Sequence, residues 1–259
     1  MVTLSWQAIG DLWILRPARP RAVLYFLGGA FIGSAPQFFY DALLNSLARS
    51  GYWVLATPYL TTPDHASIAQ TILSTWRRAE TGLGLGSLPR FGLGHSLGCK
   101  LHLLCCVADP DYTDHCYGNI FMAYSNASLP DALPWGLGIP SLDFSPSPAT
   151  TVQLIAHHYQ VVPHLLVKFQ DDTIDDTEAL EGSLKKRCGS AICRVNLPGN
   201  HGTSVGQSYP FRIENAFSPV DVLGQWIYQS VNSHNQILVN TLNYWIQQQL
   251  RNSEYTWKP

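Results

Sequence analysis

A serine placed between two glycines is the first group in this sequence that could do chemistry. In Gly94-His-Ser96-Leu-Gly98 an apolar, strand-like stretch ends at a glycine, turns through one serine and continues as a helix-like stretch. Small residues two positions either side of the serine leave the clearance that a strand and a helix need where they meet at a tight turn. Ser96 is therefore expected at the tip of a strained turn, with its hydroxyl exposed as a nucleophile.

A serine hydroxyl is a weak nucleophile until a neighbouring base accepts its proton. His201 is the leading candidate for this base, because it lies in Leu197-Pro-Gly-Asn-His-Gly202, a loop that follows the last strong strand pattern. His95 precedes the serine, and alternation along the strand points its ring away from the nucleophile, so we interpret it as a packing residue. His234 lies inside an expected helix, where no loop aims its ring. The base is therefore assigned to His201.

The acid that orients this base is expected after the strand at 165–169. The next residues, Gln170-Asp-Asp-Thr-Ile-Asp-Asp176, contain four aspartates. Asp172 is the first choice because it begins a turn of acid, small residue and aliphatic residue. Asp171 is the second choice and Asp175 the third. The remaining aspartates are expected to cap the helix that follows.

Two backbone N–H groups would have to stabilise the negative oxygen that forms when the serine attacks a carbonyl carbon. Leu97, the residue after the nucleophile, should supply one of them at a helix N-terminus. The other is expected from the glycine-rich loop after residue 27, with Ala30 as the best candidate and Phe31 next. The glycines that let the two loops fold tightly are Gly28, Gly29, Gly33, Gly94 and Gly98.

The elements that must position these residues alternate between strand and helix patterns. This alternation predicts an α/β fold in which helices cover both faces of a mostly parallel sheet. Short strands near 6–8 and 12–15, joined at Gly10-Asp11, are expected to form a hairpin. Further strands are predicted at 22–27, 52–56, 90–93, 119–123, 164–169 and 191–197, and helices at 36–50, 64–80, 96–108, 177–186 and 230–250.

The alternation breaks between residues 125 and 162. This stretch is rich in proline and glycine and carries scattered large apolar side chains. A long, apolar, irregular insertion in a compact domain is typical of a lid or a binding loop. We therefore expect one domain over residues 1–259, with a lid-like insertion at about 125–162.

Composition excludes several classes of partner. Of the 259 residues 46% are hydrophobic and 13% charged, and the net charge is −2, so no basic surface for nucleic acid is expected. No leader pattern and no apolar stretch of membrane-spanning length is found, which leaves contact with a membrane surface to the insertion. The six cysteines are interpreted as reduced thiols of a cytoplasmic protein, and none has the spacing of a metal site.

Three of these features together resemble the α/β-hydrolase superfamily over nearly the whole chain: the Gly94–Gly98 turn, the acid turn at Asp172 and His201 in Gly-Asn-His-Gly. The order serine, acid, histidine is the order of that fold. The segments 26–37, 144–148 and 166–169 look like an α/β-hydrolase family of unassigned function found in cyanobacteria and chloroplasts. The resemblance implies a serine hydrolase of a photosynthetic lineage. Two positions depart from the superfamily pattern, Leu27 where a histidine is usual and Phe169 where a glycine is usual.

The leading hypothesis is hydrolysis of a carboxylic ester or thioester through an acyl-enzyme on Ser96, without a cofactor or a metal. The substrate is expected to be a small ester with an apolar or lipid-like acyl group, because the insertion is apolar and the chain carries few charges. Acyl transfer to an acceptor other than water would use the same residues. A non-catalytic binding or assembly factor is the alternative of a different class, although it would not need a complete, ordered triad.

Overall fold

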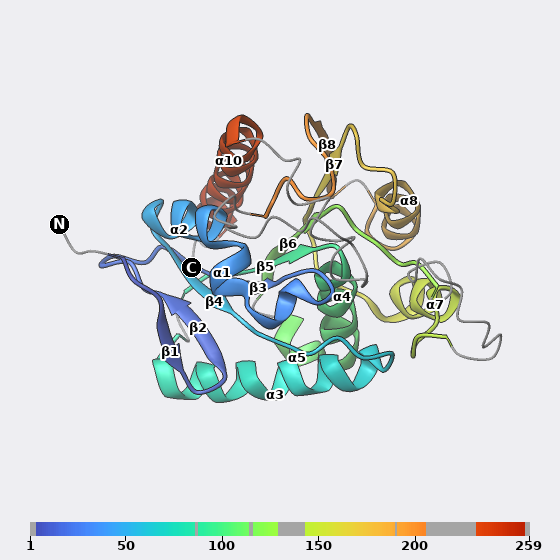
Figure 1. Ribbon diagram of the computed structural model, residues 1–259, viewed down its shortest axis with the longest axis horizontal. Coiled ribbons are helices and arrows are strands. Elements are labelled where there is room, and N and C mark those ends of the chain that lie inside the picture. Colours follow the sequence, from blue (N-terminus) through green and yellow to red (C-terminus); the bar gives the residue numbers. More distant parts are fainter. Residues whose placement is uncertain are drawn as a thin grey trace, which may run out of the picture.

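The protein is built around one eight-stranded sheet (Figure 1). The computed structural model describes residues 4–85, 88–113, 116–128, 143–189, 191–205 and 232–256. The strand order is β1-β2-β4-β3-β5-β6-β7-β8. The first two strands pair antiparallel and the other six run parallel. The strands are β1 (Gln7–Ile9), β2 (Leu12–Leu15), β3 (Ala22–Leu27), β4 (Tyr52–Ala56), β5 (Arg90–His95), β6 (Cys116–Met122), β7 (His164–Phe169) and β8 (Ile192–Leu197).

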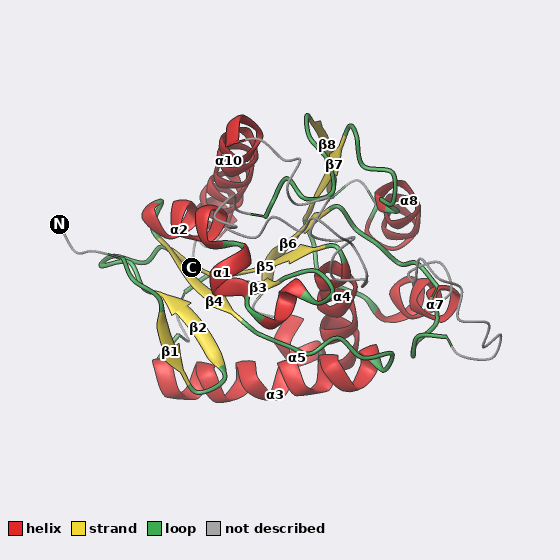
Figure 2. Ribbon diagram, viewed as in Figure 1, coloured by secondary structure: helices red, strands yellow, loops and turns green. Residues whose placement is uncertain are grey.

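Helices cover both faces of this sheet (Figure 2). One face carries α3 (His65–Leu83), α4 (Leu97–Ala108), α5 (Pro110–Thr113), α7 (Pro148–His158) and α8 (Thr177–Cys188). The other carries α2 (Asp41–Arg49) and α10 (Asn232–Thr256), and the short η1 (Ile32–Ser34) and α1 (Pro36–Phe39) precede α2. None of the helices in the described ranges is long and apolar enough to cross a membrane.

Burial on both faces explains why the central strands are apolar at every position. In β3 the side chains of Val23 and Tyr25 pack into the core beneath α3 and α4. Their neighbours Leu24 and Phe26 pack into the core beneath α2 and α10. A strand covered on both sides cannot alternate between apolar and polar residues. The sequence pattern therefore predicted β3 at its observed bounds.

Several expected elements have ends shifted by one to six residues, and two differ in more than the position of their ends. The expected helix at 36–50 is divided at Tyr40 into α1 and α2, because Tyr40 leaves the helical conformation with φ −114° and ψ 17°. The expected irregular stretch at 125–162 contains α7, which begins after Ser147, whose hydroxyl accepts a hydrogen bond from the Thr150 N–H. Residues 129–142 of the expected lid lie outside the described residues.

The approach of β3 to α4 makes Gly98 a packing requirement. A Cβ at this position would overlap the carbonyl oxygens of Leu27 and Gly28. We expect Gly98→Ala to lower the free energy of unfolding by about 3 kcal/mol or more. Gly182→Ala is the matched control, since Gly182 lies in α8 with open space around it, and should raise stability by about 0.5–1 kcal/mol. Urea unfolding measures both, and a Gly98→Ala protein as stable as wild type would contradict this reading of the turn.

Candidate active site

Ser96 occupies a sharp turn between the end of β5 and the start of α4. Its backbone has φ 52° and ψ −122°, a conformation that non-glycine residues rarely adopt. The Ser96 N–H donates to the Met122 carbonyl at 3.0 Å, which ties the turn to the end of β6. A strained serine at the carboxyl end of a central strand is the arrangement that the glycine spacing predicted.

The serine is less exposed than the sequence predicted. Ser96 is only 9% exposed, because the loop after β3 lies over it. A Cβ added at Gly29 of that loop would lie 3.3 Å from the Ser96 Cβ. The residue is therefore more buried than predicted, and Gly29 is needed where the two loops meet.

The structure brings Ser96, His201 and Asp172 together in one chain of hydrogen bonds. The Ser96 Oγ lies 2.9 Å from His201 Nε2, and Asp172 Oδ2 lies 2.8 Å from His201 Nδ1. The Asp172 side chain is fully buried, and its other oxygen accepts a hydrogen bond from the Ile174 N–H at 3.0 Å. These contacts join the segments that follow the carboxyl-terminal ends of β5, β7 and β8. Because these strands are parallel, the three ends point in the same direction.

The environment of Asp172 favours its ionised form. Burial would raise its pKa, but the hydrogen bond and charge of His201 and the Ile174 N–H together hold the pKa below its usual value. An ionised carboxylate at this distance fixes the imidazole with its Nδ1 protonated and its Nε2 free to accept a proton from the serine.

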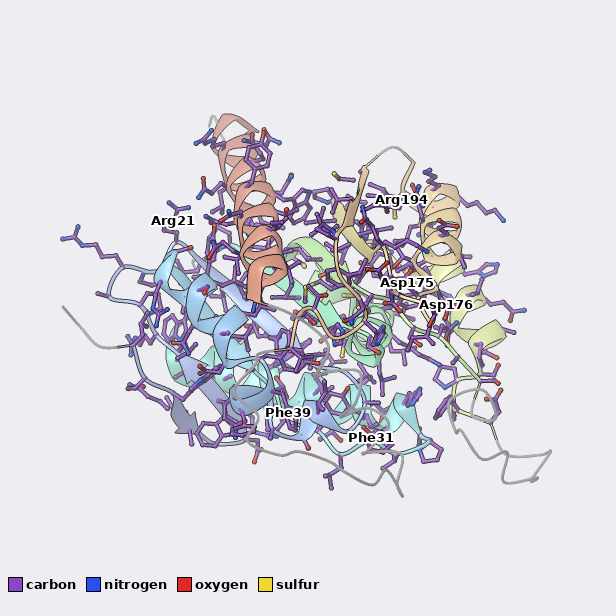
Figure 3. All side chains as sticks on the ribbon, turned by 45° about the horizontal axis from the view of Figure 1, so that its top comes forward. Arg21, Phe31, Phe39, Asp175, Asp176 and Arg194 are labelled. Carbon is purple, nitrogen blue, oxygen red and sulfur yellow. The ribbon has the colours of Figure 1, made fainter. Side chains whose placement is uncertain are left out.

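The other two candidate acids, Asp171 and Asp175, have surroundings that differ from those of Asp172. Asp171 is exposed. Asp175 accepts hydrogen bonds from the Thr177 N–H and hydroxyl, at 2.8 and 2.9 Å, and its Oδ1 lies 3.6 Å from Lys168 Nζ. Figure 3 places Asp175 and Asp176 on the loop that leads into α8. Burial raises the pKa of Asp175, and its contacts give it a structural place at the start of the helix.

The backbone N–H groups of Gly29, Ala30 and Phe31 in the glycine-rich loop differ in their acceptors. The Gly29 N–H donates to Tyr40 Oη at 2.7 Å, and the Phe31 N–H donates to Thr61 Oγ1 at 2.8 Å. For the Ala30 N–H between them, the described residues supply no hydrogen-bond acceptor. The Leu97 N–H is the first of α4 and has no acceptor within the helix.

His95 does more than pack, and its spacing in the sequence does not indicate this. Its ring is 2% exposed, and its Nδ1 lies 2.8 Å from Tyr40 Oη while its Nε2 lies 2.8 Å from the His201 carbonyl oxygen. No local signal could have found these contacts, because the partners lie 55 and 106 residues away along the chain.

Groups that could hold a metal are absent from the residues that the structure places: nowhere among them do three His, Cys, Asp or Glu side chains converge.

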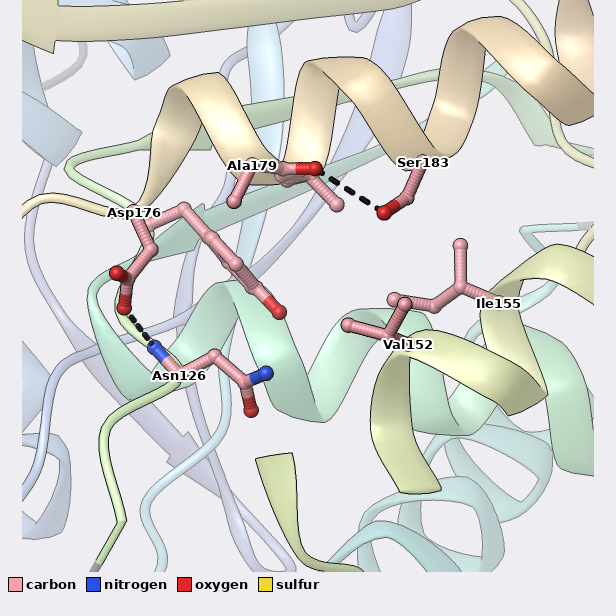
Figure 4. Close-up of a pocket in the computed structure, with 8 residues that line it drawn as sticks. Asn126, Val152, Ile155, Asp176, Ala179 and Ser183 are labelled. Atoms are coloured by element: carbon pink, nitrogen blue, oxygen red, sulfur yellow. Dashed lines mark hydrogen bonds between the residues drawn. The ribbon is translucent and has the colours of Figure 1, made fainter. Parts of the chain in front are cut away.

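A small cavity of about 90 Å³ lies between α7 and α8 (Figure 4). At one end of it the Asn126 N–H donates to Asp176 Oδ2 at 2.8 Å. Apolar side chains form most of the other walls, namely Val152, Ile155, Ala179 and Leu180.

Lys100 is a buried cation beside the site that the sequence did not single out. It is 1% exposed, its Nζ donates to the Pro146 carbonyl at 3.1 Å, and it lies 5.6 Å from the centroid of the Phe144 ring. The His65 ring stacks on the same phenylalanine, with ring centroids 4.3 Å apart. Lys100 therefore holds the segment after residue 143 against α4.

Burial lowers the pKa of Lys100 to about 8, against an ordinary value of 10.5, with Asp143 partly opposing the shift. The unfolded chain thus binds more protons than the folded chain between these two values, so stability rises with pH there, by up to about 3 kcal/mol. We expect Lys100→Met to be more stable than wild type at pH 7, and its advantage to shrink from pH 8 to pH 10.5. Urea unfolding of both proteins across this range tests this; an advantage that grows with pH would contradict it.

Solved structures of esterases and lipases share this fold. A fungal esterase from Rhizomucor miehei superimposes with a TM-score of 0.66 and 15% identity, over 97% of this chain and 85% of that chain. Carboxyl esterase 2 of Tuber melanosporum gives 0.62 and 16%, over 96% and 87%. A soluble variant of monoglyceride lipase from Saccharomyces cerevisiae gives 0.62 and 12%, over 95% of each chain. The chain therefore has the α/β-hydrolase fold, as predicted.

Sequence comparison places the chain more narrowly. No curated protein sequence matches it. The model of one family, described as "Protein of unknown function (DUF1350)", matches residues 5–248, nearly the whole chain. The chain belongs to this DUF1350 family.

Proposed function

We propose that the protein hydrolyses a carboxylic ester or thioester through an acyl-enzyme on Ser96. The observation that carries the proposal is the unbroken chain of hydrogen bonds from Asp172 through His201 to Ser96. In the first step the Ser96 Oγ bonds to the acyl carbon while His201 Nε2 takes the hydroxyl proton. The proton then passes to the leaving alcohol or thiol as its bond to the acyl carbon breaks. A water molecule, deprotonated by the same nitrogen, releases the acid and restores the serine.

Two amides are proposed to stabilise the negative oxygen of the tetrahedral intermediate. The Leu97 N–H lies at the start of α4, where the helix dipole adds positive charge. The Ala30 N–H is favoured over that of Phe31, because the Phe31 N–H is already bonded to Thr61 Oγ1. Removing one such donor in a serine hydrolase costs about 10²- to 10³-fold in kcat.

The proposed substrate is an ester with an apolar acyl group. Apolar side chains are exposed on the segments next to the site: Phe31 beside the glycine-rich loop is 40% exposed, and Ile174, two residues after the acid, is 39% exposed. Single exposed side chains are ordinary, but two on segments flanking one site favour an apolar ligand. The lid role of residues 125–162, and its contact with a membrane surface, are part of this proposal.

We also propose, from the state of the cysteines, that the protein lies in the cytoplasm. All six cysteines are free thiols, including the buried Cys99, Cys105 and Cys106 and the more accessible Cys188 and Cys193. Free thiols that remain unpaired are typical of a reducing compartment, which favours the cytoplasm. From the resemblance stated above, we also propose a photosynthetic lineage for the protein.

A series of p-nitrophenyl esters tests the proposed function. We expect release of p-nitrophenol from the acetate, butyrate and octanoate esters, with kcat/KM rising toward the longer chain because apolar surface near the site is buried on binding. Ser96→Ala protein is the background control. If none of the esters is cleaved faster than this background, the hydrolase proposal fails and the binding-factor alternative gains support. A fall of kcat/KM with chain length would overturn the apolar substrate alone.

A further inference from the structure

We propose that Tyr40 and His95 form a buried bridge that positions the glycine-rich loop and the His201 loop relative to each other, and so sets the rate of acyl transfer to Ser96. Both are positioning residues, since neither contacts the reacting atoms. The inference rests on the proposed function and adds residues that the triad does not include.

The bridge connects the two loops through three short contacts. Tyr40 Oη accepts the Gly29 N–H at 2.7 Å and lies 2.8 Å from His95 Nδ1. On the far side of the ring, His95 Nε2 lies 2.8 Å from the carbonyl oxygen of His201. Tyr40 is fully buried and His95 is 2% exposed, so no bulk water competes for these bonds.

Only one arrangement of protons satisfies all three contacts. The carbonyl oxygen of His201 can only accept, so His95 Nε2 must carry the ring proton. The lone pair of Nδ1 then accepts a hydrogen bond from the Tyr40 hydroxyl. The oxygen of this hydroxyl in turn accepts a hydrogen bond from the Gly29 N–H. Burial lowers the pKa of His95 to about 3, with the charge of His201 acting in the same direction, and burial raises the pKa of Tyr40. Both groups are thus neutral at pH 7, as this arrangement requires.

Each end of the bridge lies next to a group that the proposed reaction needs. Gly29 directly precedes Ala30, whose N–H is the proposed oxyanion donor. The carbonyl held by His95 belongs to His201, whose ring is the proposed base. An oxyanion donor must lie about 2.7–3.1 Å from the developing charge, and a displacement of about 1 Å costs about 10²-fold in rate. Loosening the bridge is therefore expected to misplace both groups together.

A second tyrosine limits where the glycine-rich loop can move. Tyr59 Oη donates to the Gly28 carbonyl at 2.6 Å, so adjacent residues of the loop are bonded by two different side chains. Gly28 is held by a bond that does not involve His95. Loss of the Tyr40 hydroxyl should therefore shift the loop near Gly29 and Ala30 without unfolding it, which makes kcat the sensitive quantity.

The test compares Tyr40→Phe, His95→Leu and the double variant with wild type. We expect each single change to lower kcat for p-nitrophenyl butyrate by about 10- to 100-fold with KM changed less than about threefold. The double variant should be no slower than the slower single variant, because both changes break the same bridge. His95→Gln should recover part of the loss, since its side-chain amide can still donate to the His201 carbonyl.

Tyr112→Phe is the matched control, because Tyr112 is also a buried tyrosine and its hydroxyl has no partner among the described residues. It should keep wild-type kcat. Single variants at wild-type kcat, or effects that multiply in the double variant, would overturn the bridge. Failure of wild-type protein to react with a fluorophosphonate would instead overturn the proposed function.

A readout independent of activity examines the bridge itself. In ¹⁵N-histidine NMR spectra, with the His95 signals assigned by their loss in His95→Gln, we expect a neutral ring protonated at Nε2 from pH 5 to pH 9. Tyr40→Phe should shift the Nδ1 signal, because it removes the hydroxyl that donates a hydrogen bond to this nitrogen. A ring protonated at Nδ1, or one that titrates near pH 6.5, would overturn the proposed arrangement.

Discussion

Ser96→Ala is expected to lower kcat for p-nitrophenyl ester hydrolysis by about 10⁴- to 10⁶-fold, because the proposed acyl-enzyme cannot form without the Oγ atom. The fold should survive the change. The Ser96 turn is fixed by its backbone bond to Met122 and by close packing of the flanking glycines, and the side chain contributes one hydrogen bond to His201. We expect the free energy of unfolding to change by less than about 1 kcal/mol.

Ser96→Gly separates the chemistry from the backbone strain. Glycine adopts a positive φ at little cost, so this variant should be about 1 kcal/mol more stable than Ser96→Ala while remaining equally inactive. Steady-state kinetics and urea unfolding measure the two effects on the same samples. Turnover of either variant within tenfold of wild type would show that a group other than the Ser96 hydroxyl is the nucleophile.

Asp172→Asn is expected to produce the second-largest loss, about 10³- to 10⁴-fold in kcat with little change in KM. The amide keeps the shape of the carboxylate but removes the charge that stabilises the protonated imidazole, and it favours the wrong tautomer of His201. The 2.8 Å contact to Nδ1 and the lowered pKa of Asp172 both favour an ionised acid at this position.

Asp171→Asn and Asp175→Asn are the controls, because both lie on the same loop. Asp171 is exposed, so its replacement should leave kcat within about twofold. Asp175 is bonded to Thr177 at the start of α8, so its replacement should lower stability by about 1 kcal/mol and leave kcat within about tenfold. A larger loss of kcat in Asp175→Asn than in Asp172→Asn would show that the acid is Asp175 and that its assignment to Asp172 is wrong.

Much of the fold was predictable because the pattern that identifies each element is local. The strands at 22–27, 52–56 and 164–169 have the bounds that their apolar runs predicted. The break at Tyr40 was not predictable, since the residues around it keep a helical pattern while Tyr40 itself takes φ −114° and ψ 17°. Helix α7 was not predicted because proline, which occupies its first position, is also typical of loops.

The candidate site was predictable where chain order constrains it. Ser96, Asp172 and His201 were chosen from their places after strands, and the structure brings their side chains together; their catalytic roles stay a prediction. The bridge and Lys100 were not predictable. The hydrogen-bond partners of His95 and Lys100 lie 46 or more residues away, and no spacing rule links a strand histidine to a tyrosine between helices. Burial of polar groups with distant partners becomes visible only once the chain is folded.

The most direct test of the account is the site of reaction with a fluorophosphonate. This reagent phosphonylates a serine only where a base activates the hydroxyl and donors stabilise the phosphoryl oxygen. We expect one phosphonyl group per chain, located by peptide mass spectrometry on Ser96, formed far more slowly in Asp172→Asn and absent in Ser96→Ala. Wild-type protein that stays unlabelled, or Ser96→Ala protein labelled as fast as wild type, would contradict the account.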